Sequence, residues 1–127
     1  MAKTVVSTES APGAIGPYSQ AIRAGELLFL SGQIPLDPAT GQLVSGSIED
    51  ETRQVMRNLE AVLKAGGATF DHVVRTTIFL TDLGDFAAVN QVYGTYFKDA
   101  PPARATVQVA ALPRGVRVEI DAIAHLA

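Results

Sequence analysis

The chain has 127 residues, 10 lysines and arginines against 13 acidic residues, a formal net charge of −3 and no cysteine. This length suits a single domain, residues 1–127. The acidic balance disfavours a polyanion as main partner, so we expect no nucleic acid. The absence of cysteine excludes disulfides, a thiolate nucleophile and cysteine-based zinc sites.

A cytoplasmic location without membrane attachment is expected. Residues 1–7 lack the apolar run of a signal peptide, and no segment has the length of a membrane span. A chain without cysteine also suits a reducing compartment.

Two antiparallel strands are predicted near the N-terminus, at residues 18–24 and 27–31. Short apolar runs there flank the tight-turn sequence Ala24-Gly25-Glu26. Two prolines and a glycine make residues 35–41 a surface loop.

An amphipathic helix follows. Ser47 and Asp50 resemble a capping box, and apolar residues then recur at helical spacing until Gly66-Gly67. Residues 72–80 are rich in valine, threonine, isoleucine and phenylalanine, which predicts a strand.

A second helix is predicted from an apolar stripe that runs from Phe86 to Phe97, and Ala100-Pro101-Pro102 ends it. Two further strands, 104–110 and 116–126, complete the chain. The resulting order ββαβαββ lacks strict alternation of strand and helix, so it predicts an α+β fold with both helices on one face of a mixed sheet.

One face of this sheet is expected to carry polar groups. Along the last strand Glu119 and Asp121 alternate with apolar residues. If this strand is the neighbour of the preceding one, Arg104 and Glu119 share a polar face. Other strands are apolar on both sides, and two helices can cover only one of them, so we expect a closed homo-oligomer with polar clefts between subunits.

Familiar catalytic constellations are missing from the sequence. His72 and His125 are far apart and nothing has the spacing of a metal-ligand pair, so no metal is expected. Several longer segments are more informative. They are Ile15-Gly16-Pro17-Tyr18-Ser19-Gln20-Ala21, Leu30-Ser31-Gly32-Gln33-Ile34-Pro35, Thr76-Thr77-Ile78-Phe79-Leu80-Thr81-Asp82-Leu83, Phe86-Ala87-Ala88-Val89-Asn90, Pro102-Ala103-Arg104-Ala105-Thr106-Val107 and Val118-Glu119-Ile120. Together these segments closely resemble the family of 2-iminobutanoate/2-iminopropanoate deaminases, the reactive-intermediate deaminases.

The resemblance implies a chorismate-mutase-like fold, a homotrimer and three active sites at subunit interfaces. It implies hydrolysis of 2-imino and enamine acids, such as 2-iminobutanoate, 2-iminopropanoate and 2-aminoacrylate, to 2-keto acids and ammonia. No cofactor is implied, because pyridoxal phosphate belongs to the enzymes that release these substrates.

Three residues match catalytic positions of the family. Arg104 matches a substrate-binding arginine, and a planar guanidinium can hold a carboxylate through two parallel hydrogen bonds. Glu119 matches an acidic residue that orients water towards C2 of the iminium and handles protons. The ordinary alternatives are a surface Arg104 and a Glu119 that only pairs with Arg104 or Arg117. Tyr18 matches a pocket tyrosine, although simple packing is its ordinary role.

Four further residues match substrate-binding positions: Ser31, Gly32, Thr106 and Asn90. Gly32 would allow close backbone approach, or form an ordinary bulge. Thr106 stands where relatives often have cysteine, so thiol chemistry is excluded there. An exposed helix residue is the alternative for Asn90.

Two other functions stay open at this point. A non-catalytic trimer that binds small carboxylates or acts like a chaperone would use Arg104 equally well, and Glu119 distinguishes it from an enzyme. A ribonuclease or translation inhibitor is disfavoured by the acidic balance and the lack of a basic aromatic surface.

Overall fold

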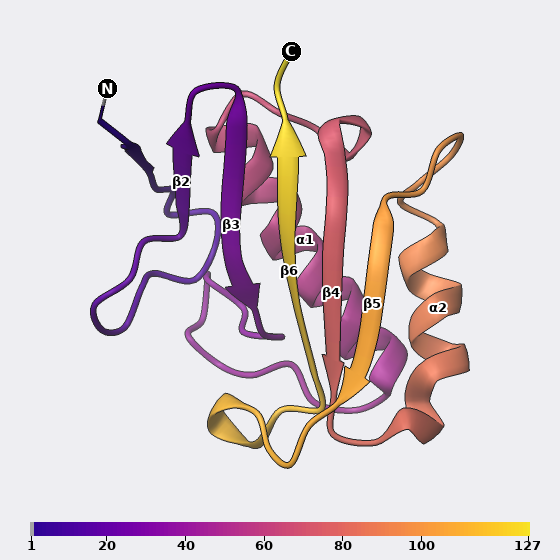
Figure 1. The fold of residues 1–127 in the computed structure, drawn as a ribbon. Helices are drawn as coiled ribbons and strands as arrows, with labels where there is room; N and C mark the ends of the chain where they lie inside the picture. Colours follow the sequence, from indigo (N-terminus) through magenta and orange to yellow (C-terminus); the bar gives the residue numbers. More distant parts are fainter. Residues whose placement is uncertain (1) are drawn as a thin grey trace.

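A computed structural model describes residues 2–127 as one sheet with two helices (Figure 1). The helices are α1, Ile48–Ala65, and α2, Phe86–Gly94. The strands are β1 Thr4–Val6, β2 Ala21–Ala24, β3 Leu27–Gln33, β4 Val73–Leu80, β5 Ala103–Gln108 and β6 Val118–His125.

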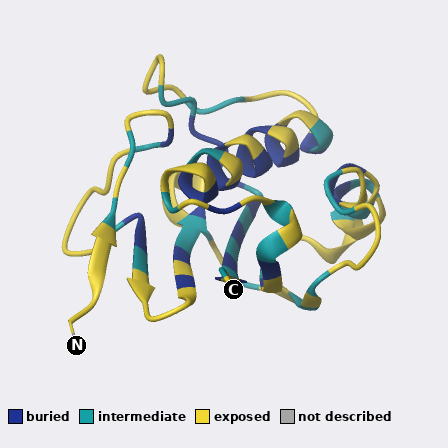
Figure 2. Ribbon diagram, turned by 90° about the horizontal axis from the view of Figure 1, so that it is seen from above, coloured by how far each residue is buried: buried dark blue, intermediate teal, exposed yellow. Residues whose placement is uncertain are grey.

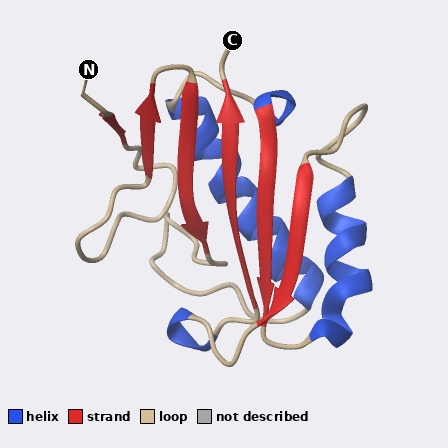
Figure 3. Ribbon diagram, in the orientation of Figure 1, coloured by secondary structure: helices blue, strands red, loops and turns tan. Residues whose placement is uncertain are grey.

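The strands form a mixed sheet in the order β1-β2-β3-β6-β4-β5. Every pair of neighbours is antiparallel except β4 and β5, which run parallel. Both helices lie on the same side of the sheet (Figures 2 and 3). The predicted α+β class with two helices on one face is therefore confirmed.

Two details of the predicted strand arrangement are wrong. β1 was not predicted, because three residues are too short to show a period; it pairs with β2 at the sheet edge. β5 and β6 are not neighbours, because β4 lies between them. The reason is the β4-α2-β5 crossover, which returns the chain parallel to β4 and leaves β5 at the outer edge.

The core lies between α1 and the covered face of the sheet. Ser47 begins α1 by accepting a hydrogen bond from the Asp50 N–H at 3.0 Å, as the sequence predicted. Alternate residues of each central strand face the helices, and burying them drives the packing. The largest fully buried apolar side chains are Leu28, Val55, Met56, Leu59, Val62, Leu63, Ile78, Leu80, Val89, Val118 and Ile120.

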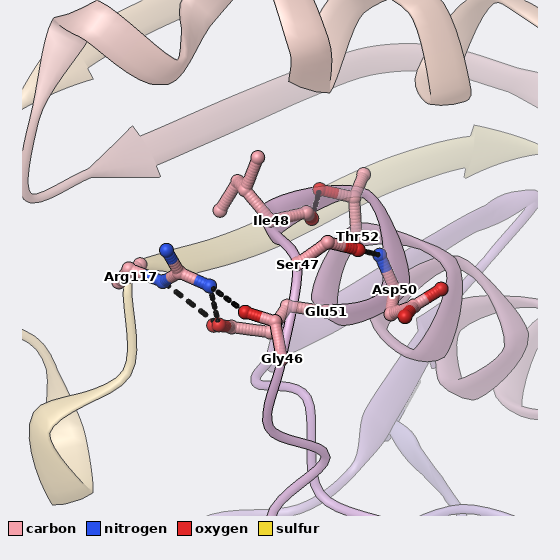
Figure 4. A network of polar contacts seen from close by, with 7 residues as sticks. All are labelled: Gly46, Ser47, Ile48, Asp50, Glu51, Thr52 and Arg117. Atoms are coloured by element: carbon pink, nitrogen blue, oxygen red, sulfur yellow. Dashed lines mark hydrogen bonds and ion pairs between the residues drawn. The ribbon is translucent and has the colours of Figure 1, made fainter.

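An ion pair fixes the point where β6 begins (Figure 4). The Arg117 guanidinium donates from Nε to Glu51 Oε2 at 2.8 Å, donates again to the same oxygen from Nη2, and donates to the Gly46 carbonyl at 2.7 Å. Glu51 lies in the first turn of α1, and its side chain is only 8% exposed. Arg117 therefore turns towards α1 and does not join Glu119 on the opposite face of the sheet.

The other face of the sheet has no helix over it in residues 2–127 (Figure 2). Register places Phe29 beside Ile123 there, and Phe79 beside Val107. Phe29 is 42% exposed and Val107 40% exposed. We call this surface the open face. An apolar sheet surface of this kind is typical of a protein–protein contact.

Candidate functional site

Arg104 projects from β5 towards α2 on the helix-covered side. Its partner across the ladder is Thr76 of β4, which is buried under the helices. The Arg104 guanidinium donates from Nη1 to Asn90 Oδ1 on α2 at 2.7 Å. Arg104 and Asn90, which were named separately from the sequence, thus form one group, in which the amide orients the guanidinium.

Two aromatic rings of α2 flank the same guanidinium. Arg104 Cζ lies 5.5 Å from the Phe86 ring centroid and 5.2 Å from the Tyr93 ring centroid. The Tyr93 hydroxyl shares a hydrogen bond of 2.6 Å with Thr76 Oγ1. Burial raises the pKa of Tyr93, and this effect exceeds the lowering by the Thr76 hydrogen bond and by the charge of Arg104. The Tyr93 side chain therefore stays uncharged beside the guanidinium. Cation–π contacts on two sides hold the guanidinium in place.

The outer edge of β5 adds free backbone donors beside Arg104. The Val109 N–H donates to the Leu80 carbonyl at 2.8 Å, towards β4. Because N–H groups alternate along a strand, those of Arg104, Thr106 and Gln108 point away from the sheet. A guanidinium next to outward N–H groups is suited to bind a carboxylate.

The Thr106 hydroxyl lies on the same side of β5 as Arg104. Thr106 Oγ1 is buried and has no hydrogen-bond partner among the residues that the structure describes.

Glu119 lies in a second hollow, on the open face. β3 carries a bulge between Leu30 and Gln33, where two residues oppose one of β6. The backbone of Gly32 in this bulge lies close to the Glu119 side chain. A Cβ added at Gly32 would lie 2.2 Å from Glu119 Oε2. Only glycine fits there with the carboxylate in its present position.

Tyr18 and Ser31 line the hollow together with Gly32 and Glu119. Tyr18 is 51% exposed and precedes β2 instead of starting it. The Ser31 hydroxyl donates to the Ser19 carbonyl at 2.6 Å, which ties the Tyr18 loop to the bulge. The hollow has a volume of about 570 Å³, which is larger than the volume of a small carboxylic acid.

The environment of Glu119 favours its protonated form. Burial raises the pKa of the Glu119 carboxyl, and the negative charge of Asp121 raises it further. A raised pKa makes the Glu119 carboxylate a stronger base than an ordinary glutamate, and its protonated form can return the proton.

Arg104 and Glu119 do not share a cavity within one chain, so the predicted common polar face is wrong. Arg104 opposes Thr76 and Glu119 opposes Phe79, three residues along β4. Because side chains alternate along a strand, these two positions face opposite sides of the sheet. The seven predicted residues therefore divide into an arginine half-site, Arg104, Asn90 and Thr106, and a glutamate half-site, Glu119, Tyr18, Ser31 and Gly32.

Some residues of both half-sites were not assigned to them from the sequence. Phe86 and Tyr93 were expected only as core, although their spacing with Asn90 places all three on one side of α2. The glutamate half-site also includes Ile34, Pro113 and Arg114.

Among residues 2–127 no group of three or more His, Cys, Asp or Glu side chains is placed so that it could hold a metal ion. No helix within the same range is long and apolar enough to cross a membrane.

The chain is an α+β protein in which two helices cover one face of a six-stranded mixed sheet and leave the open face without a helix among the described residues. The chain belongs to the family described as Endoribonuclease L-PSP, whose model matches residues 8–126. The resemblance to imine deaminases is confirmed, because this family includes relatives of that name.

Two relatives and one solved structure illustrate the similarity. Protein DfrA of Myxococcus xanthus is 65% identical, over 98% of this chain and 96% of the relative. A mouse protein named 2-iminobutanoate/2-iminopropanoate deaminase is 54% identical, over 96% of this chain and 90% of the relative. The structure of E. coli TdcF with bound serine has a TM-score of 0.94 and 41% identity, over 98% of this chain and 99% of TdcF.

Proposed function

We propose that this protein hydrolyses 2-imino acids, such as 2-iminopropanoate and 2-iminobutanoate, to 2-keto acids and ammonia. The observation that carries the proposal is the Glu119 carboxyl, half-buried beside Gly32 in a hollow, with its pKa raised by burial. Relatives named imine deaminases at more than 50% identity support the same reaction.

The active site in this proposal is completed by a second copy of the chain. The arginine half-site lies on the helix side of edge strand β5, and the glutamate half-site lies on the open face. A contact that joins two different surfaces is heterologous, and heterologous contacts form a ring when the rotation between subunits closes and an open filament when it does not. A homotrimer with three shared sites satisfies this condition and covers the exposed Phe29 and Val107 of the open face.

Arg104 binds the substrate carboxylate in this scheme. Its guanidinium is already oriented by Asn90 and by two aromatic rings, so little side-chain entropy remains to be lost on binding. The outward N–H of Thr106 donates a further hydrogen bond to the carboxylate. The serine bound to E. coli TdcF is a carboxylate-bearing molecule of similar size.

Glu119 moves the protons. As the bond between the water oxygen and C2 of the iminium forms, the Glu119 carboxylate accepts a proton from that water. The resulting carbinolamine takes this proton back on nitrogen. The C–N bond then breaks and ammonia leaves, while the Glu119 carboxylate accepts the hydroxyl proton as the keto group forms and passes it to the departing ammonia, which leaves as ammonium. Tyr18 and the Ser31–Gly32 backbone hold the water and the substrate against Glu119.

The alternatives have weaker support. A non-catalytic carboxylate-binding or chaperone-like trimer accounts for Arg104 but leaves the half-buried Glu119 without a role. Endoribonuclease activity, which the family description names, would require binding of a polyanion, and the chain has a net charge of −3. A cytoplasmic location stays a prediction.

The reaction is tested by adding the protein to a threonine dehydratase assay and following ammonia and 2-ketobutanoate. We expect faster release than spontaneous hydrolysis, and Glu119→Gln should lose this acceleration while it still binds a keto acid. Equal rates with and without the wild-type protein would refute the reaction. Full activity of Glu119→Gln would refute the role of Glu119.

The shared site is tested by mixing two inactive variants, Arg104→Ala and Glu119→Ala, under conditions that exchange subunits. Each interface takes its arginine from one subunit and its glutamate from the next. Random mixing in equal amounts therefore restores about one quarter of wild-type activity. No recovery in mixed oligomers confirmed by mass spectrometry would show that the site is not divided in this way.

A further inference from the structure

We propose that Asp121 is a positioning residue for the reaction, because its fixed negative charge keeps Glu119 able to hold and return the transferred proton. This inference rests on the proposed function of Glu119 and adds a residue that the sequence did not single out. It starts from the placement of two carboxylates on one face of one strand.

Asp121 lies two residues after Glu119 on β6, so both side chains project from the open face. Across the ladder Asp121 opposes Thr77 of β4. Its Oδ1 accepts a hydrogen bond from the Thr77 N–H at 3.2 Å. This bond anchors the Asp121 carboxylate to the neighbouring strand and fixes the position of its charge.

Within a single chain the other neighbours of Glu119 do not neutralise this effect. The bulge of β3 supplies Ser31 and Gly32, which are uncharged, and β4 supplies the apolar Phe79. Arg114, which is exposed, and the Tyr18 phenol line the hollow from two loops. Within residues 2–127 neither Glu119 nor Asp121 forms an ion pair with a basic side chain.

The charge of Asp121 therefore acts on Glu119 in the same direction as burial, and both raise its pKa. A stronger base removes the proton from water more readily. The protonated acid must then protonate the amine nitrogen of the carbinolamine, which is far more basic, so this second step tolerates the raised pKa.

Asp121→Asn tests the inference with little change of shape, because its amide oxygen can still accept from the Thr77 N–H. We expect the acid limb of the kcat/KM profile to move to lower pH and kcat above that limb to fall severalfold, with KM little changed. Asp121→Glu keeps the charge and should retain the wild-type limb. Asp71→Asn, on an exposed turn, is the control for a lost surface charge.

A direct titration of the Glu119 carboxyl carbon by NMR in the assembled protein separates this inference from the reaction itself. A lower midpoint in Asp121→Asn, with Asp121→Glu like the wild type, supports the coupling even if imine hydrolysis is absent. The same midpoint in wild type and Asp121→Asn overturns it, and so does an Asp121→Glu midpoint as low as that of Asp121→Asn.

Discussion

Replacing Gly32 by alanine puts a methyl group where the Glu119 carboxylate lies. The added Cβ would be 2.2 Å from Glu119 Oε2 and 2.9 Å from its Cδ. Ordinary contact begins at 3.4 Å, so the carboxylate oxygen must retreat by roughly 1 Å. The backbone need not change, because Gly32 does not adopt a positive φ.

The expected effect falls on catalysis and spares the fold. A displacement of about 1 Å in a reacting group can cost about 100-fold in rate, which corresponds to about 2.7 kcal/mol of transition-state stabilisation. The clashing atoms belong to the end of a flexible side chain that can rotate away. The free energy of unfolding should therefore change by less than about 1 kcal/mol.

The assay compares kcat/KM for 2-iminobutanoate with urea unfolding of the same samples. Gly13→Ala is the matched control, because a Cβ at Gly13 meets no atom within 4 Å and its φ is ordinary. A folded Gly32→Ala protein with wild-type kcat/KM would refute the claim that the bulge sets the position of Glu119.

Three further outcomes are expected. Arg104→Lys should lower kcat/KM about 100-fold in the dehydratase assay, because an ammonium cannot make the paired contacts of a guanidinium. At pH values above neutral, Glu119→Gln should have a higher Tm than the wild type. A carboxyl whose pKa is raised in the folded state contributes stability at low pH, and this contribution is lost as the pH rises. The ionised Glu119 carboxylate then lowers the stability of the folded protein, and glutamine removes this cost. Arg117→Ala should lower the free energy of unfolding by about 2 kcal/mol in urea, since the largely buried Glu51 carboxylate then loses its partner while water can reach the site of the half-exposed arginine. Breaking the exposed Arg53–Asp50 pair by Arg53→Ala should cost less than about 1 kcal/mol.

Much of the fold could be predicted from local sequence. The apolar period and the Ser47 cap indicated α1, and alternation indicated β6 with Glu119 and Asp121 opposite the core residues. These features depend on residues close together in the chain, where helix and strand periods are visible. The end of α2 was less accurate: the apolar stripe predicted continuation to Phe97, but the helix ends at Gly94.

The order of the strands could not be predicted in the same way. It depends on which distant segments pair, and the sequence of β5 and β6 is equally compatible with direct pairing. The structure inserts β4 between them, and this moves Arg104 and Glu119 to opposite faces. Resemblance named the residues that we propose for two half-sites, but it could not assign each residue to a face of the sheet.

The β3 bulge links the fold to the chemistry of Glu119. Leu30 and Gln33 are both buried although they are three residues apart, which requires the extra residue at Ser31–Gly32. The extra residue brings a backbone without a side chain against β6, and the space left by the missing Cβ holds the Glu119 carboxylate. That carboxylate is half-buried before any second subunit covers the open face, so its raised pKa originates within a single chain. In the proposed oligomer two effects would act against each other at this group: a second subunit would remove water, which raises the pKa of Glu119, and its Arg104 would add a positive charge, which lowers that pKa.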